Sequence, residues 1–322
     1  MGATAADISF YDHHPKPANF YREVLDGLSR SPKAIPPKFF YDERGSHLFD
    51  AICHTEDYYP TRTELSILRD NADEIAALVG EDCLLVEPGS GNSMKVRVLL
   101  DTLRPCAYMP MDISRDYLIA AAENISQDYP WLDVHAACAD FTRPMDLPYS
   151  PEGARKVAFF PGSSIGNFEP PRAAEFMANV AAMVGPGGGL LIGVDLKKDP
   201  AVLNAAYNDS EGVTAAFNLN LLERINRELD ADFDLGAFRH HAFFNEELGR
   251  MEMHLVSERD QSVRVDERRF EFAEGESIHT ECSYKYHIEE FQALADQAGF
   301  AATQVWTDPK GQFSVHFFEV NK

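Results

Sequence analysis

The strongest constraint in this sequence is a regular alternation of strand and helix patterns between residues 82 and 196. Apolar runs short enough for single strands are separated by stretches in which apolar side chains recur every three or four residues. Neighbouring parallel strands need a crossover connection, usually a helix, so this alternation predicts a doubly wound, parallel α/β sheet. The predicted strands lie in the segments 83–89, 107–114, 132–141, 156–168 and 187–196, and the first and fourth of these segments end in turns.

The pattern changes after the fifth strand. Residues 197–285 combine a long helical stretch, around 200–230, with alternating strands such as RMEMHLVSE and RRFEFAE. The chain closes with a helix and two strands joined by a tight Pro-Lys-Gly turn. We therefore predict a nucleotide-binding core at 61–196 plus 286–322, an inserted α+β lobe at 197–285, and an N-terminal segment, 1–60, that packs against the lobe.

The charge balance limits which partners the protein can bind. Lys plus Arg is 29 and Asp plus Glu is 52, which gives a net charge of −23. Such a surface repels nucleic acid and anionic membranes, whereas a cationic or zwitterionic small molecule is easier to bind. No run approaches the ~20 apolar residues of a membrane span, and the first residues lack the pattern of a secretory signal. We expect a cytoplasmic protein, a monomer or a weak oligomer.

Cysteine usage agrees with that location. The five cysteines are odd in number and include no CxxC pair, which predicts free thiols in a reducing compartment. His135 and Cys138 form a lone HxxC motif without a second pair of ligands. We therefore predict no bound metal.

A glycine-rich turn follows the first predicted strand, in the segment VEPGSGNSMK. Gly89 and Gly91 allow the backbone to approach a ligand closely, and the turn also supplies Lys95 before the next helix. A dinucleotide fingerprint would need a third glycine where Met94 stands, and here an acidic residue, Glu87, precedes the turn. The turn therefore argues against a pyrophosphate, although one G-x-G motif alone is weakly specific.

The next two predicted strands end in carboxylates. Asp112 lies where an acid can accept both hydroxyls of a ribose, and Asp140 with Phe141 suits the amine and the ring face of adenine. In isolation, an acid at a strand end is most often a solvated loop residue or a helix cap. Together with the turn, these residues favour an adenosine ligand without a diphosphate, such as S-adenosylmethionine (SAM). A nicotinamide oxidoreductase and a non-catalytic ligand-binding protein are the alternatives.

Six segments of the sequence resemble one family of enzymes. They are FFYDERGSHLFD, DYYPTRTE, EPGSGNSMK, FFPGSSIGNF, AAYND and TECSYKY, and the family is the histidine Nα-methyltransferases of ergothioneine biosynthesis. The resemblance covers nearly the whole chain and implies a class I, Rossmann-like methyltransferase fold that uses SAM. It places the cofactor contacts on Gly89, Lys95, Asp112, Asp140 and Phe141, and the amino-acid contacts on Tyr58, Asn167, Tyr207, Glu281 and Ser283.

The resemblance also suggests what the substrate residues do. Tyr58, or a water that it holds, is expected to accept the proton that leaves the amine. Glu281 and Ser283 lie two apart on an extended segment and so face the same side, where they can serve the two nitrogens of an imidazole. Asn167 and Tyr207 are neutral side chains that suit the α-amino and α-carboxylate groups. Met253 and Tyr41 are expected to line the pocket.

The expected activity is therefore Nα-methylation of L-histidine by SAM, to the trimethylated betaine hercynine. The alternative within the same chemistry is methylation of another aromatic amino acid, as in the related fungal enzymes that act on a prenylated tryptophan. Glu281 favours histidine, because a buried carboxylate left without a partner costs about 1–3 kcal/mol or more.

Overall fold

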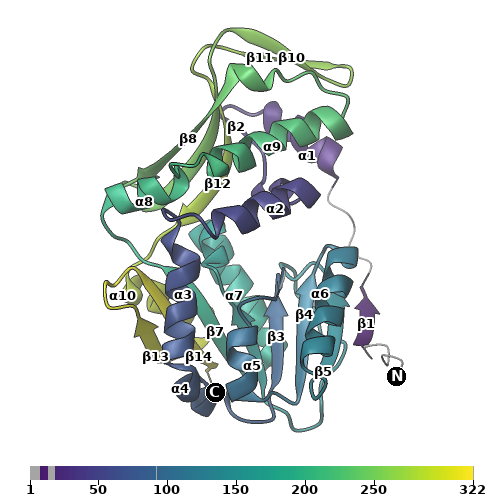
Figure 1. The fold of residues 1–322 in the computed structure, drawn as a ribbon, viewed down its shortest axis with the longest axis vertical. Helices are drawn as coiled ribbons and strands as arrows, with labels where there is room; N and C mark the ends of the chain where they lie inside the picture. The colour runs from purple at the N-terminus through teal and green to yellow at the C-terminus, as the bar shows by residue number, and fades with distance from the viewer. Residues whose placement is uncertain (1–7, 14–18, 92, 322) are drawn as a thin grey trace. The chain divides into compact units, whose positions relative to one another are not determined.

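The computed structural model describes residues 8–13, 19–91 and 93–321 (Figure 1). The chain divides into two compact units. The first comprises residues 1–16, 62–196 and 286–322, and the second comprises 17–61 and 197–285. Parts of the predicted N-terminal segment, residues 1–7 and 14–18, lie outside the described residues. The roles that we assigned to the segments remain predictions.

The first unit contains a mainly parallel sheet with the strand order β1-β5-β4-β3-β6-β7-β14-β13. From β3, the chain continues to β4 and β5 on one side and to β6 and β7 on the other, whereas β14 runs antiparallel to both its neighbours. Ligands of such sheets bind at the carboxyl ends of the strands where this order reverses. The strands are β1 (Ile8–Asp12), β3 (Leu84–Pro88), β4 (Ala107–Asp112), β5 (Asp133–Cys138), β6 (Lys156–Phe160), β7 (Gly189–Asp195), β13 (Phe300–Thr307) and β14 (Phe313–Val320).

Helices cover both faces of this sheet (Figure 1). Alternate residues of β3 illustrate the arrangement, since Leu85 packs in one apolar cluster and Leu84 and Val86 in another. Burial on both faces explains the nearly continuous apolar runs from which we predicted the doubly wound sheet, and that prediction is confirmed. The helices of this unit are α3 (Tyr59–Asp70), whose first turn belongs to the second unit, α4 (Ala72–Val79), α5 (Arg97–Leu103), α6 (Arg115–Asp128), α7 (Pro170–Val184), α10 (Ile288–Gln297) and the 3-10 helix η2 (Ser164–Asn167).

The N-terminal strand differs from our expectation that residues 1–60 pack against the inserted lobe. Residues 17–61 belong to the same unit as 197–285. By contrast, β1 forms the edge of the large sheet and pairs in parallel with β5, from Ile8 opposite Val134 to Asp12 opposite Cys138. The short segment ISFYD can extend this edge because the backbone groups of β5 are otherwise unpaired there. The pairing also brings Tyr11 to His135, whose Nδ1 lies 3.0 Å from the tyrosine hydroxyl.

The second unit contains a sheet with the strand order β2-β12-β9-β8 and a separate hairpin of β10 and β11. One face of the sheet packs on α9, where Met251, Met253 and Leu255 share an apolar cluster with Phe217 and Leu221. The strands are β2 (Lys33–Ala34), β8 (Phe238–Asn245), β9 (Arg250–Ser257), β10 (Gln261–Val265), β11 (Arg268–Phe272) and β12 (Ser277–Tyr284). The helices are α1 (Phe20–Leu28), α2 (Glu43–Ile52), α8 (Pro200–Tyr207) and α9 (Val213–Glu228), with 3-10 turns η1 (Pro37–Phe40) and η3 (Leu235–Ala237).

A bulge in β12 determines which of its side chains face the core. His279 pairs with His254 of β9, but after the shift of register Glu281 pairs with Met253. Directly paired residues point to the same side of a sheet, so Glu281 lies on the face of the buried Met253, whereas His279 lies on the opposite face. The extra residue of the bulge is Thr280, whose Oγ1 lies 3.0 Å from the carbonyl oxygen of Met253.

None of the helices in the described part of the chain has both the length and the apolar content needed to span a bilayer.

The bulge generates a stability prediction for Asn218 on α9, which is fully buried. Its Nδ2 donates to the carbonyl oxygen of His254 at 3.1 Å, and its Oδ1 accepts the Thr280 hydroxyl at 2.8 Å. We expect Asn218→Ala to lower the free energy of unfolding by about 1–3 kcal/mol, because buried polar groups lose their partners. Urea unfolding measures this. Asn179→Ala is the control, because that amide makes one long, exposed bond of 3.4 Å, and an equal loss in both variants would contradict the role of Asn218.

Candidate functional site

The glycine turn after β3 brings together residues from three strand ends. Gly89 has φ of +67° and Gly91 has φ of +52°, conformations that side chains other than glycine rarely adopt. The amide of Gly89 donates to the carbonyl oxygen of Met111 at 2.7 Å, which ties the turn to the end of β4. A Cβ at Gly89 would lie 3.1 Å from the ring of Phe141, just beyond β5. Close packing of this ring therefore requires glycine at position 89.

The two predicted strand-end carboxylates are held by their local backbone. Asp112 is partly buried and accepts the amide of Ser114 at 2.9 Å, and burial raises the pKa of Asp112. Asp140 accepts the amide of Thr142 at 3.2 Å and forms an ion pair with Arg143 at 3.0 Å. Both carboxylates thus lie at the carboxyl edge of the sheet in fixed turns. Their ribose and adenine contacts remain predictions.

Lys95 has a partner that the sequence did not reveal. Its Nζ lies 2.6 Å from Oε2 of Glu64, a residue of α3 that is 1% exposed. The Glu64 carboxylate also accepts the amide of Gly162, after β6, at 2.9 Å to each oxygen. A Cβ at Gly193 would collide with this carboxylate. Glu64 therefore fixes the ammonium of Lys95 between the turns that follow β3 and β6.

A second buried acid lies beneath the glycine turn. Glu87 is 2% exposed, and the hydroxyl of Tyr108 donates to its carboxylate. The same hydroxyl lies 3.0 Å from Oγ of Ser93. Burial raises the pKa of Glu87 to about 8, so the group is mostly protonated at neutral pH. Glu87 thus belongs to the packing under the turn.

In the second unit, the predicted substrate residues surround one buried lysine. Lys285 is 2% exposed, and its Nζ donates to Oγ of Ser283 at 2.9 Å and to the hydroxyl of Tyr207 at 3.0 Å. Burial raises the pKa of Glu281 to about 7, against the opposing effect of the Lys285 charge. Sequence reasoning did not select Lys285, although it lies in the quoted segment TECSYKY. A lysine two residues beyond a predicted contact gives no local sign of burial.

Aromatic side chains line the same cluster. The ring of Tyr58 meets the ring of Tyr207 edge-on, with centroids 6.3 Å apart, and Met253 is paired with Glu281 and buried. Tyr41 is 44% exposed, yet burial around its hydroxyl and then the charge of Glu281 raise its pKa. Each of these predicted residues therefore lies in the second unit with Lys285.

Asn167 is the predicted substrate residue that belongs to the first unit. It is the last residue of η2, after β6, and is partly buried. The positive φ of Ser163, +56°, begins this 3-10 turn, and Oγ of Ser163 accepts the amide of Asp195 on β7 at 2.9 Å. The turn that carries Asn167 is thus anchored on the neighbouring strand.

Comparison with known proteins assigns the chain to a family. A family model described as "Histidine-specific methyltransferase, SAM-dependent" matches residues 20–320. The chain belongs to this family. The Histidine N-alpha-methyltransferase of Mycolicibacterium smegmatis is 45% identical over 300 residues, or 91% of this chain and 92% of that protein. The protein of the same description from Mycobacterium tuberculosis is 43% identical over equal shares. Ergothioneine biosynthesis protein 1 of Neurospora crassa is 33% identical over 86% of this chain, which spans 32% of that longer protein.

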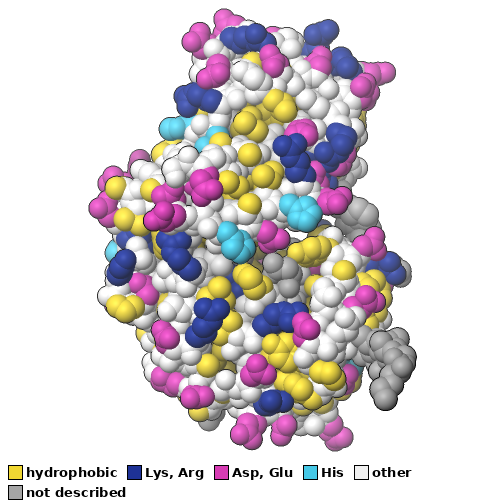
Figure 2. Space-filling view, viewed as in Figure 1, with side chains coloured by type: hydrophobic (Ala, Val, Ile, Leu, Met, Phe, Trp, Pro, Cys, Tyr) yellow, Lys and Arg dark blue, Asp and Glu magenta, His cyan; other side chains and the backbone are white. Residues whose placement is uncertain are grey.

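As a member of the histidine-specific methyltransferase family, the chain is a SAM-dependent enzyme. The predicted cofactor is therefore confirmed, and the nicotinamide alternative is excluded. The first unit fits this cofactor, because a Cβ at Gly91 would meet no described atom within 4 Å, so the glycine turn leaves its backbone open at the carboxyl edge of the sheet. Carboxylates and basic side chains are interspersed over the face shown in Figure 2, without a continuous basic patch on that face of the described residues.

The buried acid beneath the turn predicts a pH effect on stability. The pKa of Glu87 is about 8 in the folded protein and about 4.3 in an unfolded chain. Folding therefore retains a proton that the unfolded chain releases, so stability falls as pH rises between these values, by on the order of 2–5 kcal/mol. Glu87→Gln removes this titration. We expect urea unfolding to show that the free energy of unfolding of the variant, relative to that of the wild type, is larger at pH 8 than at pH 5.

Glu175→Gln, on the exposed surface of α7, is the control for Glu87→Gln and should show no such trend. A difference between Glu87→Gln and the wild type that stays constant with pH would mean that Glu87 is ionised in the fold.

Proposed function

We propose that this enzyme methylates the α-amino group of L-histidine, forming the trimethylated betaine hercynine in the first step of ergothioneine biosynthesis. The observation that carries the proposal is the cluster of Glu281, Ser283 and Tyr207 around the buried Lys285. The names of the mycobacterial and fungal relatives support the substrate and the pathway. The five free cysteines agree with a cytoplasmic location, and we propose a monomer or weak oligomer.

When bound, SAM supplies a methyl group on a cationic sulfur, which an amine lone pair displaces in line. The protein therefore has to position an unprotonated amine and exclude water. A free α-amino group has a pKa near ~8, so a usable fraction is neutral at physiological pH. We propose that Tyr58, at the edge of the Tyr207 ring, accepts the released proton directly or through a water.

The imidazole of histidine needs a polar partner for each ring nitrogen. Glu281 faces the core side of β12 beside Met253, so its carboxylate can accept the imidazole N–H, and the Ser283 hydroxyl can serve the other nitrogen. Lys285 already donates to Ser283 and Tyr207, which fixes both hydroxyl oxygens for the substrate. We assign Asn167 and Tyr207 to the α-amino and α-carboxylate groups, and Tyr41 and Met253 to the pocket wall.

For the cofactor, we propose that Asp112 accepts the ribose hydroxyls and that Asp140 and Phe141 contact adenine. Gly89 and Gly91 allow the close backbone approach that their φ angles make available. Lys95 is the cationic contact, and its ammonium is held by Glu64. This last bond means that a loss of Lys95 would also leave a buried carboxylate unpaired.

Mass spectrometry of the products from histidine and SAM tests the proposed reaction. We expect products that are heavier by one, two and three methyl groups, with the trimethylated species accumulating at long times. Parallel incubations with tryptophan, tyrosine and phenylalanine should give little product, because none of these side chains can satisfy both Glu281 and Ser283. Faster methylation of tryptophan than of histidine would replace our proposal with the tryptophan-type activity.

Glu281→Gln tests the imidazole contact while keeping the side-chain shape. A hydrogen bond to a charged group contributes about 1.5–3 kcal/mol, so histidine should bind roughly 10- to 150-fold more weakly by calorimetry, with SAM affinity nearly unchanged. Asp112→Ala is the matched variant for the cofactor, and it should weaken the binding of SAM far more than the binding of histidine. If Glu281→Gln weakened both ligands equally, the residue would be structural, and its assignment to the substrate would be wrong.

A further inference from the structure

The outer face of the β8–β9–β12 sheet carries a row of histidines that the active-site proposal does not use. His241 pairs with His254, and His254 pairs with His279, so one histidine from each strand lies in line across the sheet. Glu252 is two residues before His254 on β9 and therefore shares its face. This face is opposite to the one that carries Met253 and Glu281.

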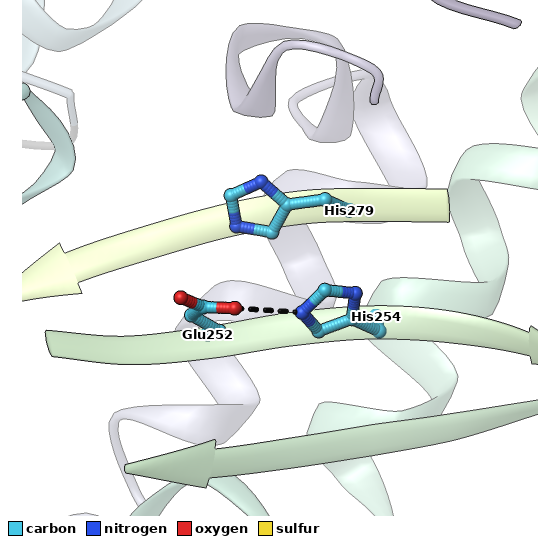
Figure 3. Close-up of side chains that lie close together, drawn as sticks. All are labelled: Glu252, His254 and His279. Carbon is cyan, nitrogen blue, oxygen red and sulfur yellow. Dashed lines mark hydrogen bonds and ion pairs between the residues drawn. The ribbon is translucent and has the colours of Figure 1, made fainter. Parts of the chain in front are cut away.

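Three of these side chains converge (Figure 3). One ligand atom each from Glu252, His254 and His279 lies within 4.8 Å of the other two. Nε2 of His254 lies 3.0 Å from Oε2 of Glu252, and the rings of His254 and His279 have centroids 4.9 Å apart. Donors bound to one ion at about 2.0–2.2 Å lie roughly 3–4 Å apart. Small rotations of the side chains would therefore bring all three onto one ion.

Hydrogen bonds orient the rings of both histidines. The nitrogen of His279 that faces Glu252 and His254 in Figure 3 is Nε2, which lies 2.9 Å from the carbonyl oxygen of Glu281. An ion bound to this nitrogen would replace that hydrogen bond, and Nδ1 of His279 would carry the proton. Nδ1 of His254 lies 3.1 Å from Oγ of Ser277 and can donate there when Nε2 binds an ion. Such outer bonds orient the ligand rings in known metal sites.

The carboxylate is oriented in the same way. Oε1 of Glu252 accepts Nε of Arg250 at 2.9 Å and Nδ2 of Asn245 at 3.0 Å, which leaves Oε2 directed at His254. The Glu252 carboxylate therefore offers one oxygen beside Nε2 of His254 to a bound ion.

We propose that Glu252, His254 and His279 form a binding site for a divalent transition metal of the zinc type. Two imidazoles and one carboxylate make a ligand set common for Zn²⁺, with the fourth position left to water. The ion would take the place of the proton between His254 and Glu252, and would join β9 to β12 next to the bulge. We predicted no bound metal from the sequence, because only strand pairing brings His279 to the other two ligands.

Titration of the untagged, chelator-treated full chain with ZnCl₂ tests this site. Calorimetry should show one equivalent bound with a micromolar or lower Kd, and Zn²⁺ should raise the melting temperature. Co²⁺ should give the visible absorption of a four-coordinate site. His254→Gln and His279→Gln should each weaken Zn²⁺ binding at least about tenfold. That is the smallest loss of metal affinity expected when even a partner of a metal ligand is removed.

His241→Gln is the matched control, since His241 lies exposed on the same face, one strand away, and it should retain the wild-type affinity. Ser277→Ala provides a milder test. It should weaken Zn²⁺ binding about tenfold, because the His254 ring loses the hydrogen bond that orients it. Circular dichroism without metal checks that each variant is folded. The proposal is overturned if the wild type binds no Zn²⁺, or if His241→Gln loses as much affinity as His254→Gln. In either case, the three side chains form only an ion-pair network with Arg250.

Discussion

A single extra residue in β12 decides which functional side chains of the second unit lie on the core face of its sheet and which lie on the outer face. Without the bulge at Thr280, His279, Glu281 and Ser283 would all point to one side, as strict alternation requires. With it, Glu281 shares the core face with Met253, and His279 shares the outer face with His254. Asn218 and the carbonyl of Met253 hold the bulge through the Thr280 hydroxyl. The proposed substrate cluster and the proposed metal site both depend on this register.

Each unit also holds a lysine inside its fold, partly buried at Lys95 and fully buried at Lys285, and in each case the cation contacts residues that position the predicted site. Burying an ammonium is unfavourable unless it is paired or hydrogen-bonded. Lys95 meets this requirement through Glu64, which is itself satisfied by the amide of Gly162. Lys285 meets it through the hydroxyls of Tyr207 and Ser283. These fixed charges bring order to side chains that would otherwise sample several rotamers, which favours a pre-organised binding site.

Several features could be predicted because neighbouring residues encode them. The apolar runs of β3 to β7 reflect burial on both faces of a parallel sheet. Gly89 was recognisable as a turn glycine, and its close contact with the Phe141 ring supplies a reason for it. The edge strand β1 was missed, because its five residues form a strand only through pairing with β5, more than a hundred residues away. Local pattern gives no information about that partner.

By itself, the sequence determined the doubly wound sheet, the glycine turn and the order of the strand-end acids, because periodicity and turn chemistry act over a few adjacent residues. Only the tertiary structure decided that Glu64 holds Lys95, that Lys285 is buried beside Glu281, and that His279 meets Glu252 and His254. Glu64 and Lys95, Tyr207 and Lys285, and His254 and His279 are pairs of residues that lie far apart in the chain. These contacts exist because strand pairing and core closure place the side chains together, and no local run of residues specifies that outcome.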